Sequence, residues 1–129
     1  MTEEGKMPSS IPPGDERRIH DRVDVDEWKV DCVAEDTFLY ASIANISEMG
    51  VFVRTEEPLA LGKRLRLAFA PPGHEPFKLH GEVAWINKVK PQGDNLNPGM
   101  GIRFVDLGLP ERERLVEVIR TIVYLREQN

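Results

Sequence analysis

Residues 64–85 read RLRLAFAPPGHEPFKLHGEVAW, and this stretch decides the fold class. Before the loop at 70–76, every second residue is apolar: Leu65, Leu67 and Phe69. After the loop the alternation resumes at Phe77, Leu79, Gly81, Val83 and Trp85. A period of two predicts a β-strand with one face toward a core, and the prolines and glycine between the runs favour a loop. The stretch therefore predicts two strands that turn these alternating side chains inward.

The same period recurs along most of the chain. It predicts further strands around residues 23–34, 38–46, 51–53 and 100–104. In the first of these the alternation changes parity between Val25 and Trp28, which predicts a β-bulge near Asp26 and Glu27. The segment 38–46 carries apolar residues at both odd and even positions, so we expect it to be buried on much of both faces.

Only the end of the chain has a helical period. Pro110 and Glu111 suit the first turn of a helix. One apolar stripe follows at helical spacing, formed by Leu115, Val118, Ile119, Ile122 and Leu125. The whole pattern predicts a mostly β fold: a six-stranded antiparallel β-barrel that is plugged or flanked by a C-terminal α-helix. Residues 1–14 are polar and proline-rich, so we expect a disordered tail before a single domain at 15–129.

Composition narrows the function. The 129 residues carry a formal net charge of −5, which disfavours duplex DNA and anionic membranes as partners. No apolar run is long enough to span a bilayer and no signal segment is evident, so the expected location is cytoplasmic. Cys32 is the only cysteine, and its apolar setting predicts a buried, inert thiol. The three histidines are scattered, so we expect no metal site and no cofactor.

The first motif is RRIHDR at residues 17–22, in which Arg18 and Arg22 form an R-x-x-x-R pair with Arg17 in front. Guanidinium groups are planar forks that bind phosphate oxygens or the O6/N7 edge of guanine. His20 lies inside the segment and is a further candidate contact, although a solvated loop histidine is the favoured alternative. Three acidic residues offset the three arginines, so a solvated, self-paired loop is the structural alternative.

The second motif is NISEMG at residues 45–50. Asn45 and Ser47 are two residues apart at a strand end, so we expect both side chains on one face, where their oxygens can accept from guanine N1 and N2 hydrogens. Gly50 is expected to take a positive φ and to leave room for a base. Asn, Ser and Gly are also common in ordinary turns, and for this motif alone the ordinary turn is favoured.

Together, R-x-x-x-R, N-x-S-x-x-G and the β-rich body resemble the PilZ family over residues 16–126. The resemblance implies that cyclic di-GMP binds on the outside of the barrel, to Arg18 and Arg22 from the first motif and to Asn45, Ser47 and Gly50 from the second. An arginine directly before the motif, here Arg17, is similar to the pattern in family members that bind an intercalated pair of ligand molecules. Trp85 is a further candidate neighbour of a guanine, with burial in the core as its alternative.

The implied function is a non-enzymatic receptor that signals to a downstream protein partner, as a monomer or weak homodimer. One rival is a PilZ-like interaction module that binds no nucleotide. A second rival, a single-stranded nucleic-acid binder, would need a basic groove with exposed aromatic residues, and the net charge disfavours it. For an enzyme, the chain offers no Ser/His/Asp or Cys/His set and no phosphate-cradling glycine loop.

Overall fold

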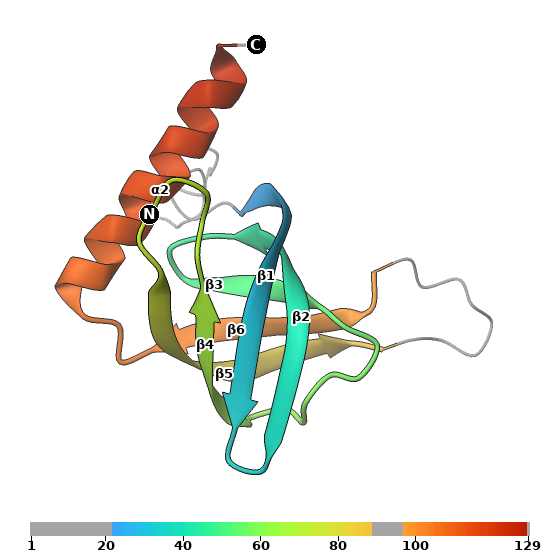
Figure 1. Cartoon of the computed structure of the whole chain (residues 1–129). Coiled ribbons are helices and arrows are strands. Elements are labelled where there is room, and N and C mark those ends of the chain that lie inside the picture. Colours follow the sequence, from blue (N-terminus) through green and yellow to red (C-terminus); the bar gives the residue numbers. More distant parts are fainter. Residues whose placement is uncertain (1–21, 89–96, 129) are drawn as a thin grey trace, which may run out of the picture.

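The computed structural model describes residues 22–88 and 97–128. Six antiparallel strands close into a barrel in the order β1-β2-β3-β6-β5-β4, and a helix follows the last strand (Figure 1). The elements are β1 Val23–Ala34, β2 Thr37–Ile46, β3 Gly50–Arg54, β4 Arg64–Phe69, β5 Phe77–Asn87, β6 Gly99–Val105 and α2 Leu109–Glu127. This architecture confirms the mostly β, six-stranded barrel with a C-terminal helix that the sequence predicts.

The barrel interior is filled by the alternating apolar side chains. The fully enclosed members come from every strand and include Val30, Cys32, Ile43, Val51, Val53, Leu67, Phe77, Val83, Met100 and Ile102. Cys32 is buried as expected, and loss of hydration, with the negative charge of Asp31 as a smaller cause, raises the pKa of its thiol to about 12. The thiol is therefore inert at neutral pH.

The bulge predicted in β1 is confirmed. The register of β1 against β2 shifts between Asp24 and Trp28. Within the shift, Glu27 has φ +46°, in the left-handed region that non-glycine residues seldom adopt. The irregularity lets Val23 and Val30, which have opposite parity in the sequence, both turn into the core.

The prediction that β2 is buried on much of both faces is wrong at the start of that strand. Phe38 and Tyr40 are 63% and 62% exposed. The physical reason is the barrel's pairing pattern: β2 pairs with β3 only from Ser42 onward, so the first half of β2 has β1 as its one strand neighbour there. In Figure 1 this β1–β2 hairpin extends below the other strands.

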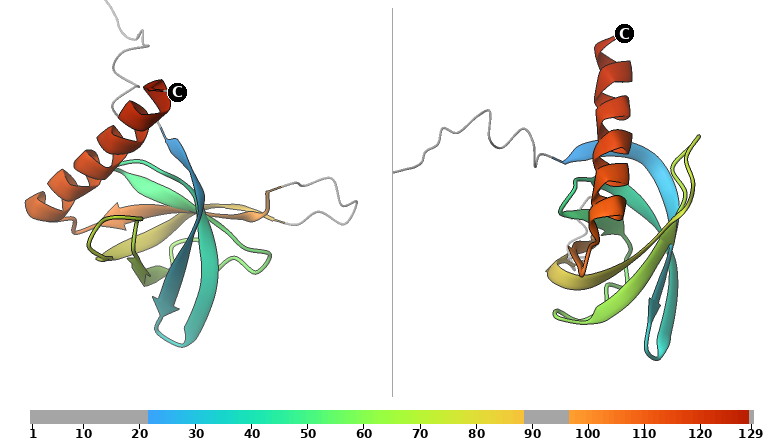
Figure 2. Two further views of the ribbon diagram at one scale, coloured as in Figure 1. Left: turned by 45° about the horizontal axis from the view of Figure 1, so that its top comes forward. Right: turned by 90° about the vertical axis from the view of Figure 1, so that its left-hand side faces the viewer.

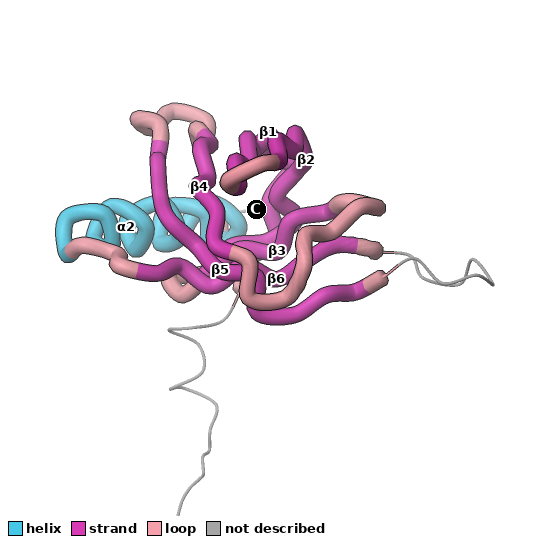
Figure 3. The backbone as a smooth tube through the Cα atoms, turned by 90° about the horizontal axis from the view of Figure 1, so that it is seen from below, coloured by secondary structure: helices cyan, strands magenta, loops and turns pink. Residues whose placement is uncertain are grey.

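Helix α2 covers one end of the barrel with its N-terminal half. Leu115 and Val118 are buried in the same core as the strands, and Ile119 and Ile122 pack against it. Leu125, the last residue of the apolar stripe, is 56% exposed, so the stripe is not buried along its whole length. The C-terminal turns of α2 extend past the strands (Figure 2). Viewed from below, the helix lies on the far side of the barrel (Figure 3).

Candidate functional site

The second motif forms a tight turn between β2 and β3. Asn45 lies near the end of β2, where it pairs with Asp24 on β1 and with Phe52 on β3. The Ser47 backbone N–H donates to the Gly50 carbonyl oxygen over 2.9 Å, and the Ser47 hydroxyl accepts a hydrogen bond from the Met49 backbone N–H over 3.1 Å. Ser47 is only 2% exposed. Its hydroxyl therefore stabilises the turn that presents Asn45.

Gly50 is required for a reason other than the expected one. Among the described residues the glycines with positive φ are Gly62 and Gly73, so the positive φ predicted for Gly50 is wrong. Gly50 pairs with Arg103 of β6, and a Cβ atom added to it would lie 2.1 Å from the carbonyl oxygen of Ile102. The glycine is needed because β6 approaches the start of β3 too closely for any side chain.

The same turn is attached to β6 and to α2. The Met49 carbonyl oxygen accepts a hydrogen bond from the Phe104 backbone N–H over 2.9 Å. The buried carboxylate of Glu48 forms an ion pair with Arg112 of α2, with 2.8 Å between Oε1 and Nη1. Sequence reasoning missed this ion pair because its partners are 64 residues apart and share no local pattern. Contacts with β6 and α2 therefore fix the turn, while Asn45 faces outward.

Arg22 reaches this turn from the start of β1. Its Nη1 donates to the Asn45 Oδ1 over 3.3 Å, so the structure brings one residue of the first motif to one of the second. Partial burial against the barrel lowers the pKa of Arg22, although the side chain as a whole remains exposed. The guanidinium stays charged at neutral pH because arginine ordinarily titrates far above it. Arg17, Arg18 and His20 lie outside the described residues.

Trp85 lies on the outer face of the barrel, which corrects the inward position predicted from its parity. The pairing of β5 with β6 slips between Val83 and Trp85, so Val83 is buried whereas Trp85 is 45% exposed. The Trp85 ring stacks on Phe52, with 5.2 Å between ring centroids and 20° between planes. Gly101 pairs with both residues, and a Cβ atom on it would lie 2.0 Å from the Trp85 Nε1.

The stacked pair borders the motif turn. Because Phe52 is the cross-strand partner of Asn45, the rings of Phe52 and Trp85 lie on the same outer face as the Asn45 side chain. Sequence reasoning missed Phe52, which is 5% exposed and has Trp85 stacked on it, although its alternation with the core residues Val51 and Val53 carries the signal. The site therefore combines a guanidinium, an amide and an aromatic surface, which are groups that bind phosphates and planar bases.

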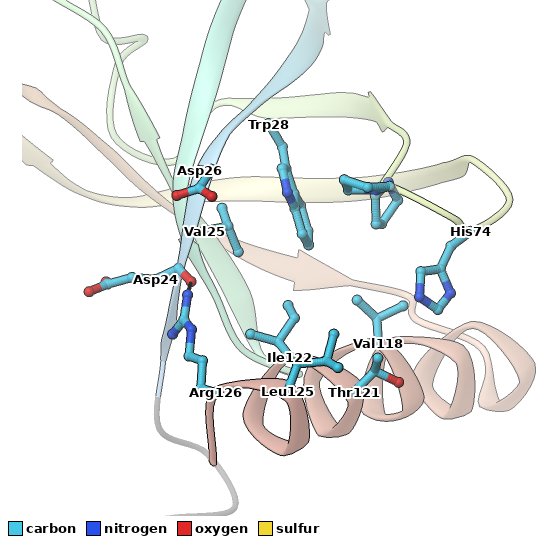
Figure 4. A pocket seen from close by; sticks show the side chains of 12 residues that line it. Asp24, Val25, Asp26, Trp28, His74, Val118, Thr121, Ile122, Leu125 and Arg126 are labelled. Carbon is cyan, nitrogen blue, oxygen red and sulfur yellow. Dashed lines mark hydrogen bonds between the residues drawn. The ribbon is translucent and has the colours of Figure 1, made fainter. Parts of the chain in front are cut away.

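A separate groove lies between β1, the β4–β5 loop and α2 (Figure 4). Its volume is about 320 Å³, and Trp28, Val118, Ile122 and Leu125 give it a largely apolar lining. Arg126 of α2 donates a hydrogen bond to the Asp24 carbonyl oxygen at one end of it. The lining includes none of the residues of the two motifs, so the groove is distinct from the site around Asn45.

The described residues form neither a metal site nor a membrane-spanning helix. Within 22–88 and 97–128, no three side chains of His, Cys, Asp or Glu come together in a way that would hold a metal ion. In the same part of the chain, no helix is both long enough and apolar enough to cross a membrane.

Among the solved structures with a similar fold are three from Escherichia coli and Bacillus subtilis. The PilZ domain with c-di-GMP of YcgR from Escherichia coli has a TM-score of 0.67 at 15% identity, over 87% of this chain and 96% of that one. YcgR in complex with c-di-GMP, from the same organism, gives 0.71 at 15% identity, over 87% of this chain and 48% of that one. The inhibitor of motility MotI/DgrA from Bacillus subtilis gives 0.65 at 20% identity, over 87% and 56%. At these identities the likeness shows the fold alone.

Sequence comparison supplies the family. No curated protein matches the chain. The PilZ domain description matches residues 16–121, a span that contains both motifs, all six strands and most of α2. The chain therefore belongs to the PilZ domain family.

Proposed function

We propose that this protein is a receptor for cyclic di-GMP. The observation that carries the proposal is the contact between Arg22 and Asn45, because it joins the two motifs at one point on the outer face of the barrel. Membership of the PilZ domain family supports it, as does the presence of c-di-GMP in two of the similar structures. The aromatic pair of Phe52 and Trp85 beside Asn45 is suited to a ligand with planar bases.

The ligand replaces contacts that the protein makes with itself. Arg22 leaves the Asn45 oxygen and binds a phosphate or the O6/N7 edge of a guanine, together with Arg17 and Arg18. The freed Asn45 oxygen then accepts from a guanine N–H, and Ser47 and Gly50 hold the turn in place. The other guanine stacks with its face on the Trp85 ring. His20 adds a contact from the arginine segment.

Binding changes the shape of the segment that precedes β1. We infer that the arginine segment at 15–22 closes over the barrel face on binding; the tail expected at 1–14, ahead of the domain expected at 15–129, lies outside the described residues. Ordering a segment on binding has an entropic cost, so we expect an affinity in the micromolar range or tighter rather than at the extreme of small-ligand binding.

The output is a changed surface for a downstream protein partner. We infer an adaptor without enzymatic activity, located in the cytoplasm, that acts as a monomer or weak homodimer. The regulated process belongs to the outputs of bacterial second-messenger signalling, such as motility or exopolysaccharide production. Because the chain spans 48% of YcgR and 56% of MotI/DgrA, those whole proteins contain regions that have no counterpart here.

Titration calorimetry of the full chain with cyclic di-GMP tests the proposal, with GTP and cyclic AMP as control ligands. We expect heat of binding with cyclic di-GMP alone. Arg22→Ala should abolish binding without unfolding the barrel, because it removes a charge-assisted contact from an exposed side chain. Ser47→Ala should weaken binding less, since the hydroxyl acts mainly on the turn. Arg120→Ala, on an exposed position of α2, is the matched control.

Two results would contradict the assignment. No heat at high micromolar cyclic di-GMP would favour the rival interaction module that binds no nucleotide. Unchanged affinity in Arg22→Ala, measured beside the control, would show that the ligand binds elsewhere.

A further inference from the structure

Next to the candidate site, three neighbouring strands bring a second polar cluster to the outer face. Lys29 of β1 pairs with Ser42 of β2, and Ser42 pairs with Arg54 of β3. The Lys29 Nζ donates to the Ser42 Oγ over 3.4 Å. Glu27, in the bulge of β1, completes the cluster through Arg54. We call these four residues, Glu27, Lys29, Ser42 and Arg54, the Arg54 patch.

The position of the patch is set by register. Arg54 is two residues along β3 from Phe52, whose partner is Asn45, so its Cα lies about 7 Å further along the strand on the same face. Arg22 approaches Asn45 from the opposite direction, because it precedes Asp24, the partner of Asn45 on β1. Asn45 therefore lies between two arginines.

The hydrogen-bonding groups of the Arg54 side chain are not all satisfied. Its Nη1 contacts the Glu27 Oε2 at 3.2 Å, and the two side chains are 39% and 65% exposed, so water weakens this ion pair. The Arg54 Nε is buried and has no acceptor anywhere in residues 22–88 and 97–128. A buried N–H without an acceptor is unfavourable. A conformer that gives up Glu27 and turns Nε outward removes this penalty when an anion is present.

The backbone of Glu27 points to the same conclusion. Its φ of +46° is uncommon for a residue with a side chain, and such conformations gather at functional sites. The bulge there places a carboxylate against a cation beside the ligand surface. A carboxylate in this position occupies Arg54 as an internal substitute for an external anion.

We propose that the Arg54 patch is a second anion subsite of the ligand surface, and that it binds a phosphodiester group of the cyclic dinucleotide. A cyclic dinucleotide carries two phosphates on one ring, and the two arginines on either side of Asn45 match that distribution. Arg54 donates to one phosphate, Lys29 adds positive charge, and Glu27 competes with the phosphate for Arg54. The inference rests on the proposed function and adds the residues that would bind the phosphate farther from Arg22.

Two substitutions with opposite expected effects test the subsite by calorimetry on the full chain with cyclic di-GMP. Arg54→Ala should weaken binding about tenfold or more, because it removes a charge-assisted contact. Glu27→Gln should tighten binding about two- to fivefold, because it removes the competing carboxylate. Arg66→Ala is the control for lost charge, since Arg66 is exposed on β4, which neighbours neither β2 nor β3. Should Arg54→Ala fail to fold, Arg54→Gln keeps most of the stem and gives the same comparison.

Each outcome decides the matter. Weaker binding in the Arg54 variant together with tighter binding in Glu27→Gln supports the subsite. If the wild type binds and the Arg54 variant matches Arg66→Ala within twofold, the subsite is rejected while the proposed function stands. If Glu27→Gln weakens binding as much as Arg54→Ala does, the ion pair is structural and the subsite is also rejected. A wild type that binds no cyclic di-GMP rejects both.

Discussion

At the scale of single residues, Cys32 should make the free energy of unfolding depend on pH. Its thiol is buried in the barrel, and its pKa is raised from 9.0 to about 12, first by burial and second by Asp31. The charged form of a thiol is the deprotonated one, so the unfolded chain releases this proton near pH 9 whereas the folded chain keeps it. The free energy of unfolding must therefore decrease as pH rises from about 9 toward 12, by up to about 1.4 kcal/mol per pH unit.

Urea unfolding at pH 8, 9 and 10 measures this effect, with Cys32→Ala as the variant that lacks the thiol. Other groups titrate in the same range, so the useful quantity is the difference in unfolding free energy between wild type and variant. We expect the wild-type advantage to shrink as pH rises. A constant difference across the three pH values would contradict the raised pKa.

Residue chemistry explains which site residues the sequence predicts. Asn45, Ser47 and Gly50 stand out because their types and spacing suit a presenting turn, and the structure places them there. The alternation predicts the wrong face for Trp85 because the register shift between β5 and β6 leaves no trace in the apolar pattern. Val83 and Trp85 are both apolar whether or not the strand is regular. In β1 the slip is visible, because Val25 and Trp28 differ in parity.

At the scale of elements, α2 is fastened to the barrel by polar contacts as well as by its core residues. The Arg114 guanidinium lies over the Phe77 ring, with 4.0 Å between its carbon and the ring centroid. Its nitrogens also donate to the carbonyl oxygens of Glu75 and Pro76, at 2.7 and 3.4 Å. This side chain joins the helix to the β4–β5 loop at the point where Phe77 enters the core.

Arg114→Ala should lower the free energy of unfolding by about 1–2 kcal/mol, because it removes a cation–π contact and leaves two carbonyl groups with one donor fewer. Urea unfolding monitored by circular dichroism measures the change. Arg120→Ala, on an exposed position of the same helix, should stay within about 0.5 kcal/mol of wild type. Equal effects of the two substitutions would mean that the Arg114 contacts contribute nothing specific.

The elements themselves are predicted well from local pattern, and their surroundings are not. The alternation in β4 and β5 and the helical period of α2 are properties of neighbouring residues. Exposure of Phe38 and Tyr40 depends instead on where β3 begins to pair with β2. Exposure of Leu125 depends on where the barrel ends beneath the helix. Both are set by distant parts of the chain.

At the scale of the whole molecule, a ligand that binds only the folded state must stabilise it. With cyclic di-GMP at about 100 times its dissociation constant, the gain is about 2.7 kcal/mol, which corresponds to roughly 10 °C in Tm for a domain of this size. Thermal unfolding with and without ligand measures the shift. We expect GTP and cyclic AMP to leave Tm unchanged and Arg22→Ala to lose the shift. An equal shift with GTP would indicate binding of guanine nucleotides in general.

The order in which the strands close is the part of the fold that no local pattern contains. β3 pairs with β6, and β1 pairs with β4, across long stretches of intervening chain. The sequence predicts a six-stranded barrel with a C-terminal helix, and the structure has that architecture, but the order β1-β2-β3-β6-β5-β4 is known from the structure alone. The Glu48–Arg112 ion pair is not predicted either, because Glu48 stands at a position that the N-x-S-x-x-G pattern leaves open and Arg112 lies outside both motifs.

That ion pair has a thermodynamic consequence. Glu48 belongs to the loop that displays Asn45, and Arg112 belongs to α2, so a movement of the helix that breaks this ion pair also removes one support of the proposed ligand site. Coupling between two equilibria is reciprocal. If cyclic di-GMP binds at Asn45 as we propose, a protein that binds α2 and separates Arg112 from Glu48 would change the affinity for the nucleotide, and the nucleotide would change the affinity for that protein by the same factor.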